Sequence, residues 1–211
     1  MEINFASQRA KMVQNSIKSV TDDHKIIRAF AQIPRHLFVP KEYRALAYQD
    51  ESLPIGFGQT ISQPSLVAEM LSLLQLTGTE KVLEVGAGSG YQTALLSQLA
   101  NKVYTIERIP KLAKRAYQVL SKLHITNVIV IEGDGTLGLE NKAPFDAIIV
   151  AASSPHIPRP LVDQLQNQGR IVIPITDEDG GEKLKLGVKN GKTLHTLNCG
   201  AVRFVPLVTE Q

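Results

Sequence analysis

From residue 81 to residue 175, short apolar runs alternate with longer stretches whose apolar residues recur at helical spacing. The apolar runs have the length of strands that are buried on both faces of a sheet. Alternation of this kind predicts parallel strands with helices on both faces, a doubly wound α/β fold. The predicted strands are residues 81–85, 102–106, 127–131, 145–150 and 169–175, and the predicted helices are residues 90–100, 110–123 and 158–166.

The pattern changes after Pro174. Residues 183–188 alternate polar and apolar side chains, and residues 193–199 return in the same way. Between them lies Asn190-Gly191, and Asn-Gly between two alternating runs is the strongest short signal for a β-hairpin. The sequence therefore predicts a mostly parallel sheet that ends in an antiparallel hairpin.

The chain before the sheet carries a different pattern. Residues 5 to about 32 show helical periodicity with polar interruptions, and Thr21-Asp22-Asp23 offers an N-cap for a second helix. Pro34 ends that helix. A further helix begins at Pro64, and the residues between the two read as an irregular or short-stranded arm. We expect a single domain over residues 1–211, with N-terminal helices and the arm in residues 1–63 and the α/β core with its hairpin in residues 64–211.

The composition narrows the class of partner. A chain of 211 residues with 43% apolar and 20% charged residues suits one globular domain with a full core. A formal net charge of +3 without a basic block predicts no nucleic-acid partner. No apolar run has the length of a membrane span, the N-terminus lacks the pattern of a signal peptide, and the single cysteine, Cys199, fits a reducing compartment. We therefore expect a cytoplasmic monomer with no membrane partner.

A glycine-rich turn follows the first predicted strand of the sheet. Gly86, Gly88 and Gly90 alternate with other residues, and a helix-prone run starts at Tyr91. The dinucleotide fingerprint G-x-G-x-x-G/A would place a small residue where Tyr91 stands, so the spacing disfavours NAD. The early third glycine resembles the nucleotide turn of S-adenosylmethionine-dependent methyltransferases, and this resemblance supplies the name of the cofactor.

Two acidic residues follow the next two predicted strands. Glu107 ends the second strand about 20 residues after the turn, where α/β nucleotide sites place a carboxylate for a ribose diol, although it could also pair with Arg108 or Lys111. Asp134 lies in a Gly-Asp-Gly sequence after the third strand, which is also a common turn sequence. In methyltransferases of this class an acidic residue there approaches the adenine amino group. We expect both to meet the glycine turn at one sheet edge.

Four segments are similar to protein-L-isoaspartate O-methyltransferases. They are residues 34–40 (PRHLFVP), 50–64 (DESLPIGFGQTISQP), 143–150 (APFDAIIV) and 201–208 (AVRFVPLV), and the likeness spans about residues 25–208. The resemblance implies transfer of a methyl group from S-adenosylmethionine to the free carboxylate of L-isoaspartyl residues in damaged proteins and peptides. Repair would follow through a methyl ester and a succinimide, with D-aspartyl residues left open as acceptors.

The resemblance also implies roles for individual residues. Ser62 is the expected catalytic residue, although a serine just before a helix can also be a plain N-cap. The expected substrate-binding residues are Ile55, Ser62, Val205 and Leu207. The expected cofactor-binding residues are Gln59, Thr60, Ile61, Glu84, Gly86, Ala87, Gly88, Gly90, Glu107, Arg108, Asp134 and Gly135. The histidines are scattered without ligand spacing, so no metal is expected.

The expected reaction is consistent with the residues present. A free carboxylate with a reference pKa of about 3.9 is ionised at neutral pH, so no general base is required. The sequence departs from the family pattern at Ser65, where bacterial relatives often have an aromatic residue, and at Ala151-Ala152-Ser153, which replaces a more usual Thr-Ala-Ala. Three alternatives stay open: a methyltransferase of this fold with another acceptor, an NAD-dependent oxidoreductase, and a non-catalytic nucleotide-binding module.

Overall fold

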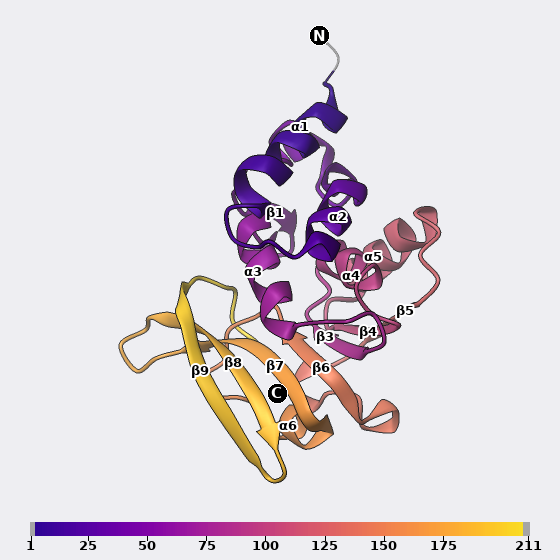
Figure 1. Cartoon of the computed structure of the whole chain (residues 1–211). Coiled ribbons are helices and arrows are strands. Elements are labelled where there is room, and N and C mark those ends of the chain that lie inside the picture. Colours follow the sequence, from indigo (N-terminus) through magenta and orange to yellow (C-terminus); the bar gives the residue numbers. More distant parts are fainter. Residues whose placement is uncertain (1–2, 209–211) are drawn as a thin grey trace.

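The computed structural model describes residues 3–208, which fold around a seven-stranded sheet (Figure 1). Its strands are β3 (Lys81–Val85), β4 (Lys102–Glu107), β5 (Val128–Glu132), β6 (Phe145–Val150), β7 (Leu165–Thr176), β8 (Glu182–Asn190) and β9 (Thr193–Val202). They lie in the order β5-β4-β3-β6-β7-β8-β9. The first five strands of this order are parallel to one another. β8 pairs antiparallel with β7 and with β9. The predicted fold class, including the terminal hairpin, is confirmed.

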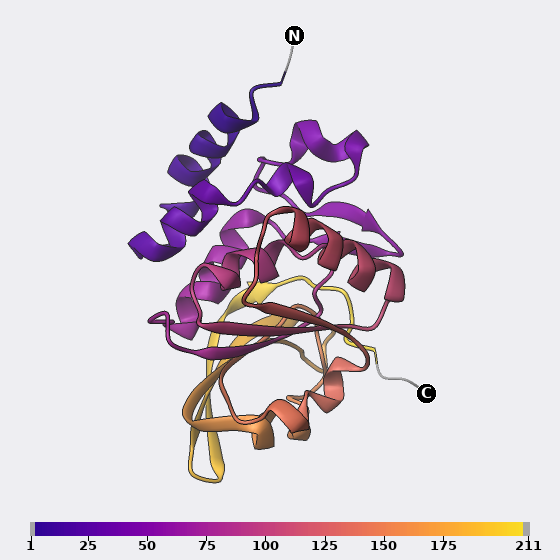
Figure 2. The ribbon, with the colours of Figure 1, turned by 90° about the vertical axis from the view of Figure 1, so that its right-hand side faces the viewer.

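Helices cover both faces of the sheet (Figure 2). The helices α3 (Pro64–Leu74), α4 (Tyr91–Ser97) and α5 (Pro110–Lys122) lie on one face, and α6 (Arg159–Gln164) lies on the other. In β6, Ala147 and Ile149 pack on the side of α3 and α4, whereas Ile148 and Val150 pack with Leu161 of α6. This two-sided burial explains why the strands are continuous apolar runs in the sequence.

The N-terminal residues form a second helical layer over α3 and α4, on the side away from the sheet (Figures 1 and 2). Its elements are α1 (Phe5–Met12), the π-helical turn η1 (Val13–Ile17), α2 (His24–Gln32) and the 3-10 helices η2 (Arg35–Leu37) and η3 (Lys41–Leu46). Asp23 is the N-cap of α2, and its side chain accepts a hydrogen bond from the backbone N–H of Lys25. Within residues 3–208, no helix combines the length and apolar character that crossing a bilayer requires.

A buried arginine and tyrosine join the N-terminal layer to the start of α4. Arg35 is 0% exposed and donates to the carbonyl oxygens of Ala47 at 2.8 Å and Glu51 at 3.2 Å. Its guanidinium carbon lies 5.0 Å from the ring centre of Tyr91, which also packs edge-on against Phe38. Burial lowers the pKa of Arg35 to about 10, so this side chain stays charged at neutral pH.

The arm before α3 is a small antiparallel hairpin. Its strands β1 (Leu53–Gly56) and β2 (Gln59–Ile61) pair with each other, separately from the large sheet. The turn between them exposes Phe57, while Leu53, Ile55 and Ile61 are buried. The hairpin brings the segment before α3 toward the glycine turn after β3.

The structure differs from the predicted boundaries after β6. The helix expected over residues 158–166 ends at Gln164, and β7 begins at Leu165, four residues earlier than the expected strand. Leu165 pairs with Phe145 before the register shifts, and Gln168 adopts a φ of 64° at this irregularity. The polar residues 166–168 lack the apolar character of a strand, so the sequence pattern placed them outside it.

The contact between the Arg35 guanidinium and the Tyr91 ring gives a prediction about the free energy of unfolding. Tyr91→Ala removes a fully buried ring and should lower the free energy of unfolding by about 3–5 kcal/mol. The Tyr91 hydroxyl has no hydrogen-bond partner among residues 3–208, so Tyr91→Phe should stay within about 1 kcal/mol of the wild type. Urea unfolding followed by circular dichroism measures both variants. Equal losses in the two would show that the hydroxyl, and not the ring, joins the layers.

Candidate active site

A cavity lies at the carboxyl ends of β3, β4 and β6, where the strand order reverses. Open α/β sheets bind their ligands at this position. We call it the turn cavity, because the glycine turn after β3 forms its floor. It is lined by Gln59, Thr60, Ile61, Ser62, Val67, Val85, Gly86, Ala87, Gly88, Ser89, Tyr91, Gln92, Ile106, Glu107, Arg108, Ile109, Gly135, Ala151, Ala152, Val205, Pro206, Leu207 and Val208.

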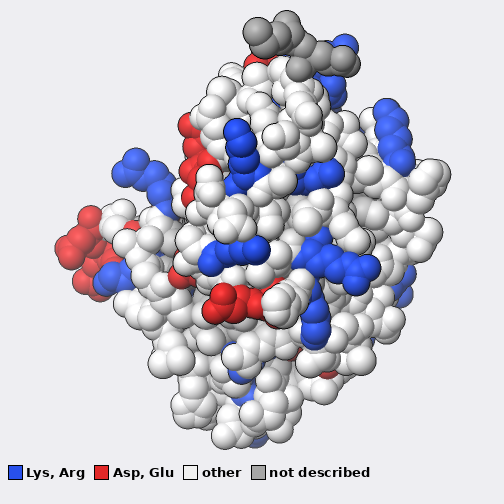
Figure 3. All heavy atoms as spheres, turned by 45° about the horizontal axis from the view of Figure 1, so that its top comes forward, with Lys and Arg blue, Asp and Glu red and all other residues white. Residues whose placement is uncertain are grey.

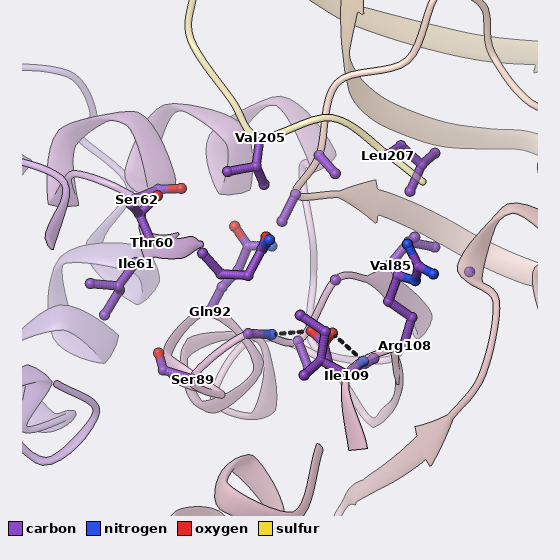
Figure 4. A pocket seen from close by; sticks show the side chains of 18 of the residues that line it. Thr60, Ile61, Ser62, Val85, Ser89, Gln92, Arg108, Ile109, Val205 and Leu207 are labelled. Carbon is purple, nitrogen blue, oxygen red and sulfur yellow. Dashed lines mark hydrogen bonds between the residues drawn. The ribbon is translucent and has the colours of Figure 1, made fainter. Parts of the chain in front are cut away.

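The turn cavity brings together predicted residues from distant parts of the chain (Figure 4). Thr60, Ile61 and Ser62 enter from one side, Arg108 lies at the end of β4, and Val205 and Leu207 lie opposite the glycine turn. The predicted residues that line it are Gln59, Thr60, Ile61, Ser62, Gly86, Ala87, Gly88, Glu107, Arg108, Gly135, Val205 and Leu207. The predicted residues Ile55, Glu84, Gly90 and Asp134 are outside the lining.

The glycine turn requires backbone angles that other residues rarely adopt. Gly86, Gly88 and Gly90 have φ values of 91°, 53° and 86°. At Gly90 a Cβ would also lie 3.1 Å from the Cβ of Ala116 on α5, so this glycine lets α4 pack closely on α5. The early third glycine thus serves helix packing from outside the cavity, and the following Tyr91 packs against the N-terminal layer.

The side chain of Glu107 connects the glycine turn to the residues that follow β4. Its carboxylate is 6% exposed and accepts two backbone hydrogen bonds, from the N–H of Gly88 at 2.8 Å and from the N–H of Ile109 at 2.9 Å. Each bond uses a different carboxylate oxygen, so each oxygen keeps a lone pair for a ligand hydroxyl. Glu107 therefore shapes the turn and lines the cavity at the same time.

Glu84 supports the turn from behind instead of facing the cavity. It is 0% exposed within β3, and its oxygens accept hydrogen bonds from Gln92 Nε2 at 3.1 Å and Thr93 Oγ1 at 2.5 Å, both on α4. Burial raises the pKa of Glu84 to about 7. Successive side chains of a strand point to opposite faces, so Glu84 faces α4 beneath the turn.

The other two residues outside the lining have local partners. The side chain of Ile55 is 2% exposed and lies 3.3 Å from the position that a Cβ on Gly88 would take, so it packs against the back of the turn. Asp134 caps the 3-10 helix η4 (Gly135–Leu137), where it accepts from the backbone N–H and the hydroxyl of Thr136. Its neighbour Gly135 lines the cavity in its place.

A second cavity, which we call the outer groove, adjoins the turn cavity. It is lined by Ser52, Thr60, Ser62, Gln63, Ser65, Leu66, Glu69, Ala151, Ala201, Val202, Arg203, Phe204 and Val205. Thr60, Ser62, Ala151 and Val205 line both cavities. Burial raises the pKa of Glu69 above its usual value. The outer groove therefore offers one carboxylate and one guanidinium beside the shared residues.

Ser62 lies at the boundary between the two cavities. The N-cap of α3 is Gln63, and the side chain of Ser62 makes no hydrogen bond within residues 3–208. The alternative of a plain N-cap serine therefore does not describe this residue. In Figure 4 its hydroxyl points toward the space below Val205. A free hydroxyl at this boundary can donate to a group that reaches from the outer groove into the turn cavity.

Several lining residues were not predicted from the sequence. Ser89 lies within the glycine turn and Gln92 follows it by two positions, Ile109 follows Glu107 by two positions, and Ala151 and Ala152 follow β6. Their common signal is a position just after the carboxyl end of a parallel strand, where ligands of such sheets bind. Among residues 3–208, no group of three or more His, Cys, Asp or Glu side chains could hold a metal ion.

The residues of the turn cavity fit S-adenosylmethionine. Glu107 can accept from a ribose diol, while Val85, Ile106 and Ile109 offer apolar walls for a purine ring. A Cβ on Gly135 would lie 2.3 Å from Val85, so only glycine fits beside that wall. Within residues 3–208, the N–H groups of Gly86, Ala87, Gly88 and Gly90 already donate to acceptors of the protein, so the N–H of Ser89 is the one amide of the turn left to bind the carboxylate of an amino acid moiety.

Comparison with known proteins identifies the family. The sequence model of the family "Protein-L-isoaspartate(D-aspartate) O-methyltransferase (PCMT)" matches residues 7–211. The chain belongs to this family. It is 48% identical over 206 residues to the protein-L-isoaspartate O-methyltransferase of Roseiflexus sp. strain RS-1, covering 98% of this chain and 94% of the relative. It is 52% identical over 206 residues to the enzyme of that name from Dictyoglomus turgidum, covering 98% and 93%.

Solved structures of the family share the fold. A structure named protein-L-isoaspartate O-methyltransferase superposes with a TM-score of 0.86 at 30% identity, covering 95% of this chain and 66% of the other. A Plasmodium falciparum structure of the same family superposes with a TM-score of 0.83 at 26% identity, covering 98% and 99%. That crystal structure is a complex with S-adenosyl-L-homocysteine, the product of methyl transfer from S-adenosylmethionine.

The buried carboxyl of Glu84 gives a pH prediction. Its pKa is about 7 in the folded protein and near 4.5 when unfolded, so its ionisation opposes folding as pH rises through this window. Well below pH 4.5 the carboxyl is protonated in both states and carries no penalty, and at pH 4.5 the penalty is still small. Glu84→Gln should therefore gain stability relative to the wild type by about 3 kcal/mol between pH 4.5 and pH 8. Urea unfolding at both pH values measures the difference, and a pH-independent difference would contradict the assignment.

Proposed function

We propose that the two cavities together transfer the methyl group of S-adenosylmethionine to the free carboxylate of an isoaspartyl residue. The protein is a member of the isoaspartate methyltransferase family, and the turn cavity has the donors and walls that this cofactor requires. The outer groove opens beside it and shares Ser62 and Val205 with it. The single observation that carries the proposal is Ser62, whose hydroxyl lies at the boundary of a cofactor cavity and a groove.

The cofactor half of the proposal rests on Glu107 and the glycine turn. When bound, S-adenosylmethionine supplies an electrophilic methyl group on a sulfonium centre. The Glu107 carboxylate would accept hydrogen bonds from the ribose hydroxyls. The two hydrogen bonds that it accepts from the backbone hold Gly88 and Ile109 in place where they would surround the nucleoside. Gly135 and Ile109 line the cavity where they would enclose the purine, and Gln59 to Ile61 line it from the arm, where they would cover the cofactor.

The role of Glu107 is tested by cofactor affinity. Glu107→Ala removes the acceptor of two backbone N–H groups and of the ribose, so the dissociation constant of S-adenosyl-L-homocysteine should rise about 10- to 100-fold. Glu132→Ala is the matched control, because Glu132 is the register partner of Glu107 on β5 and lies exposed outside the lining. Isothermal titration calorimetry measures both. Binding of the Glu107→Ala protein within twofold of the wild type would refute the assignment.

The acceptor half rests on Ser62 and the outer groove. The acceptor carboxylate is already ionised at neutral pH, so the site must hold it in line with the methyl group without removing a proton. The Ser62 hydroxyl donates to one carboxylate oxygen and leaves the other free to attack. Val205 and Leu207 form the apolar wall opposite the glycine turn that would keep the carboxylate away from water (Figure 4). The peptide on either side of the isoaspartyl residue lies along the outer groove.

Ser62 is tested by separating turnover from cofactor binding. Ser62→Ala should lower kcat for an isoaspartyl peptide by about 100-fold, since it removes a donor aimed at the reacting carboxylate. The affinity for S-adenosyl-L-homocysteine should change less than about threefold, because the ribose and purine partners remain. Radiolabelled methyl transfer and calorimetry give the two values. Wild-type turnover in this variant would end the proposal for Ser62.

We also propose that the chain acts as a single-domain monomer in the cytoplasm, without nucleic-acid or membrane partners. One hydrophobic cluster runs from α1 and α2 through α3 and α4 to the sheet, which supports a single domain. Residues of one chain form both cavities. On the face drawn in Figure 3, basic side chains are scattered in small groups among uncharged atoms. Sedimentation equilibrium should give the 23.1 kDa mass of one chain, and twice that mass would refute the monomer.

A further inference from the structure

The last described segment of the chain lines both cavities. We call residues 203–208 the strap. After β9 ends at Val202, the strap crosses the loop that follows β6. Val205 lines the turn cavity and the outer groove, and Leu207 lines the turn cavity. The position of the strap therefore sets one wall for the cofactor and one for the acceptor.

The strap is joined to the loop after β6 by a short parallel bridge at Ser153. The backbone N–H of Ser153 donates to the carbonyl of Val205 at 2.8 Å, and the N–H of Leu207 donates to the carbonyl of Ser153 at 2.6 Å. Pro206, between them, has no N–H to add to the bridge. These two backbone hydrogen bonds alone would hold the strap only weakly to the loop after β6.

A carboxylate adds the missing attachment. Glu182, the first residue of β8, accepts from the hydroxyl of Ser153 at 2.8 Å with one oxygen and from the backbone N–H of Phe204 at 2.5 Å with the other. Glu182 is the register partner of Val202, so it lies where the strap leaves the sheet. Ser153 is 4% exposed. Hydrogen bonds to an ionised acceptor are stronger than neutral ones, so this pair can hold the strap to the loop.

We propose that Glu182 and Ser153 are positioning residues that hold the strap closed over the bound cofactor and acceptor. Neither side chain lines the turn cavity or the outer groove, so both act through Val205 and Leu207. Cofactor release requires the strap to move, because Val205 and Leu207 cover the turn cavity. The Glu182 carboxylate therefore sets how readily the strap opens. When saturating cofactor and acceptor hold the strap closed, Val205, Leu207 and the geometry at Ser62 are the same with or without this carboxylate. This inference rests on the proposed function only for its kinetic consequence.

The kinetic test compares binding with turnover. Glu182→Ala should raise KM for both S-adenosylmethionine and an isoaspartyl peptide about tenfold, and kcat at saturation should stay within about twofold. Glu182→Gln keeps an acceptor for the Phe204 N–H and should restore KM to within about threefold of the wild type. Asp177→Ala is the control, because it breaks the ion pair of Asp177 with Lys183 in the same hairpin without touching the strap. A fall in kcat without a change in KM would overturn the proposal.

Amide exchange tests the strap independently of methyl transfer. In the free protein, the Phe204 and Leu207 amides should exchange about tenfold faster in Glu182→Ala than in the wild type, and Asp177→Ala should leave them unchanged. If Glu182→Ala does not fold, Ser153→Ala, which removes only the hydroxyl, must show faster exchange at the same two amides. Unchanged exchange in the folded variant refutes the strap closure even if the protein methylates isoaspartyl peptides. Faster exchange supports it even if another acceptor is found.

Discussion

The site depends first on the two backbone hydrogen bonds accepted by the Glu107 carboxylate. They fix Gly88 of the glycine turn to Ile109 beyond β4, so two loops that are about 20 residues apart keep one geometry. The parallel pairing of β3 with β4 brings these loops together, and the carboxylate then holds them at bonding distance. Beneath the turn, Glu84 of β3 accepts hydrogen bonds from Gln92 and Thr93 and so anchors α4 to β3. One carboxylate faces the ligand, and the other supports the turn from behind.

The second constraint is the shared wall between the turn cavity and the outer groove. Ser62 and Thr60 come from the arm, Ala151 from the end of β6, and Val205 from the strap, so three separate segments meet at one boundary. The acceptor carboxylate has no proton to lose. The site therefore lowers the activation barrier of methyl transfer by positioning the carboxylate and by excluding water. This explains why the site has a serine and apolar walls where a hydroxyl-methylating enzyme would need a base. The arm and strap define the acceptor, and the glycine turn defines only the cofactor.

The sequence predicted the features that local pattern determines. The alternation of runs predicted the sheet and its hairpin, and the spacing of the glycines predicted a ligand-binding turn and disfavoured NAD. It could not show which way a side chain points within an apolar strand, so Glu84 was placed in the cofactor site although it faces α4. Asp134 lies after β5, where it caps η4 through Thr136, and its expected contact with the purine stays a prediction. The hydrogen bond between Ser153 and Glu182 joins residues that are 29 positions apart in the sequence, and no local pattern reveals such a contact.

Membership of the family and the geometry of Ser62 lead to one central claim, that the protein recognises the misplaced carboxylate of an isoaspartyl residue. The most direct measurement is mass spectrometry of two peptides of identical sequence, one with isoaspartate and one with aspartate, after incubation with S-adenosylmethionine and the protein. The account predicts one added methyl group on the isoaspartyl peptide and none on its aspartyl twin. Equal methylation of both peptides, or of neither, would contradict it.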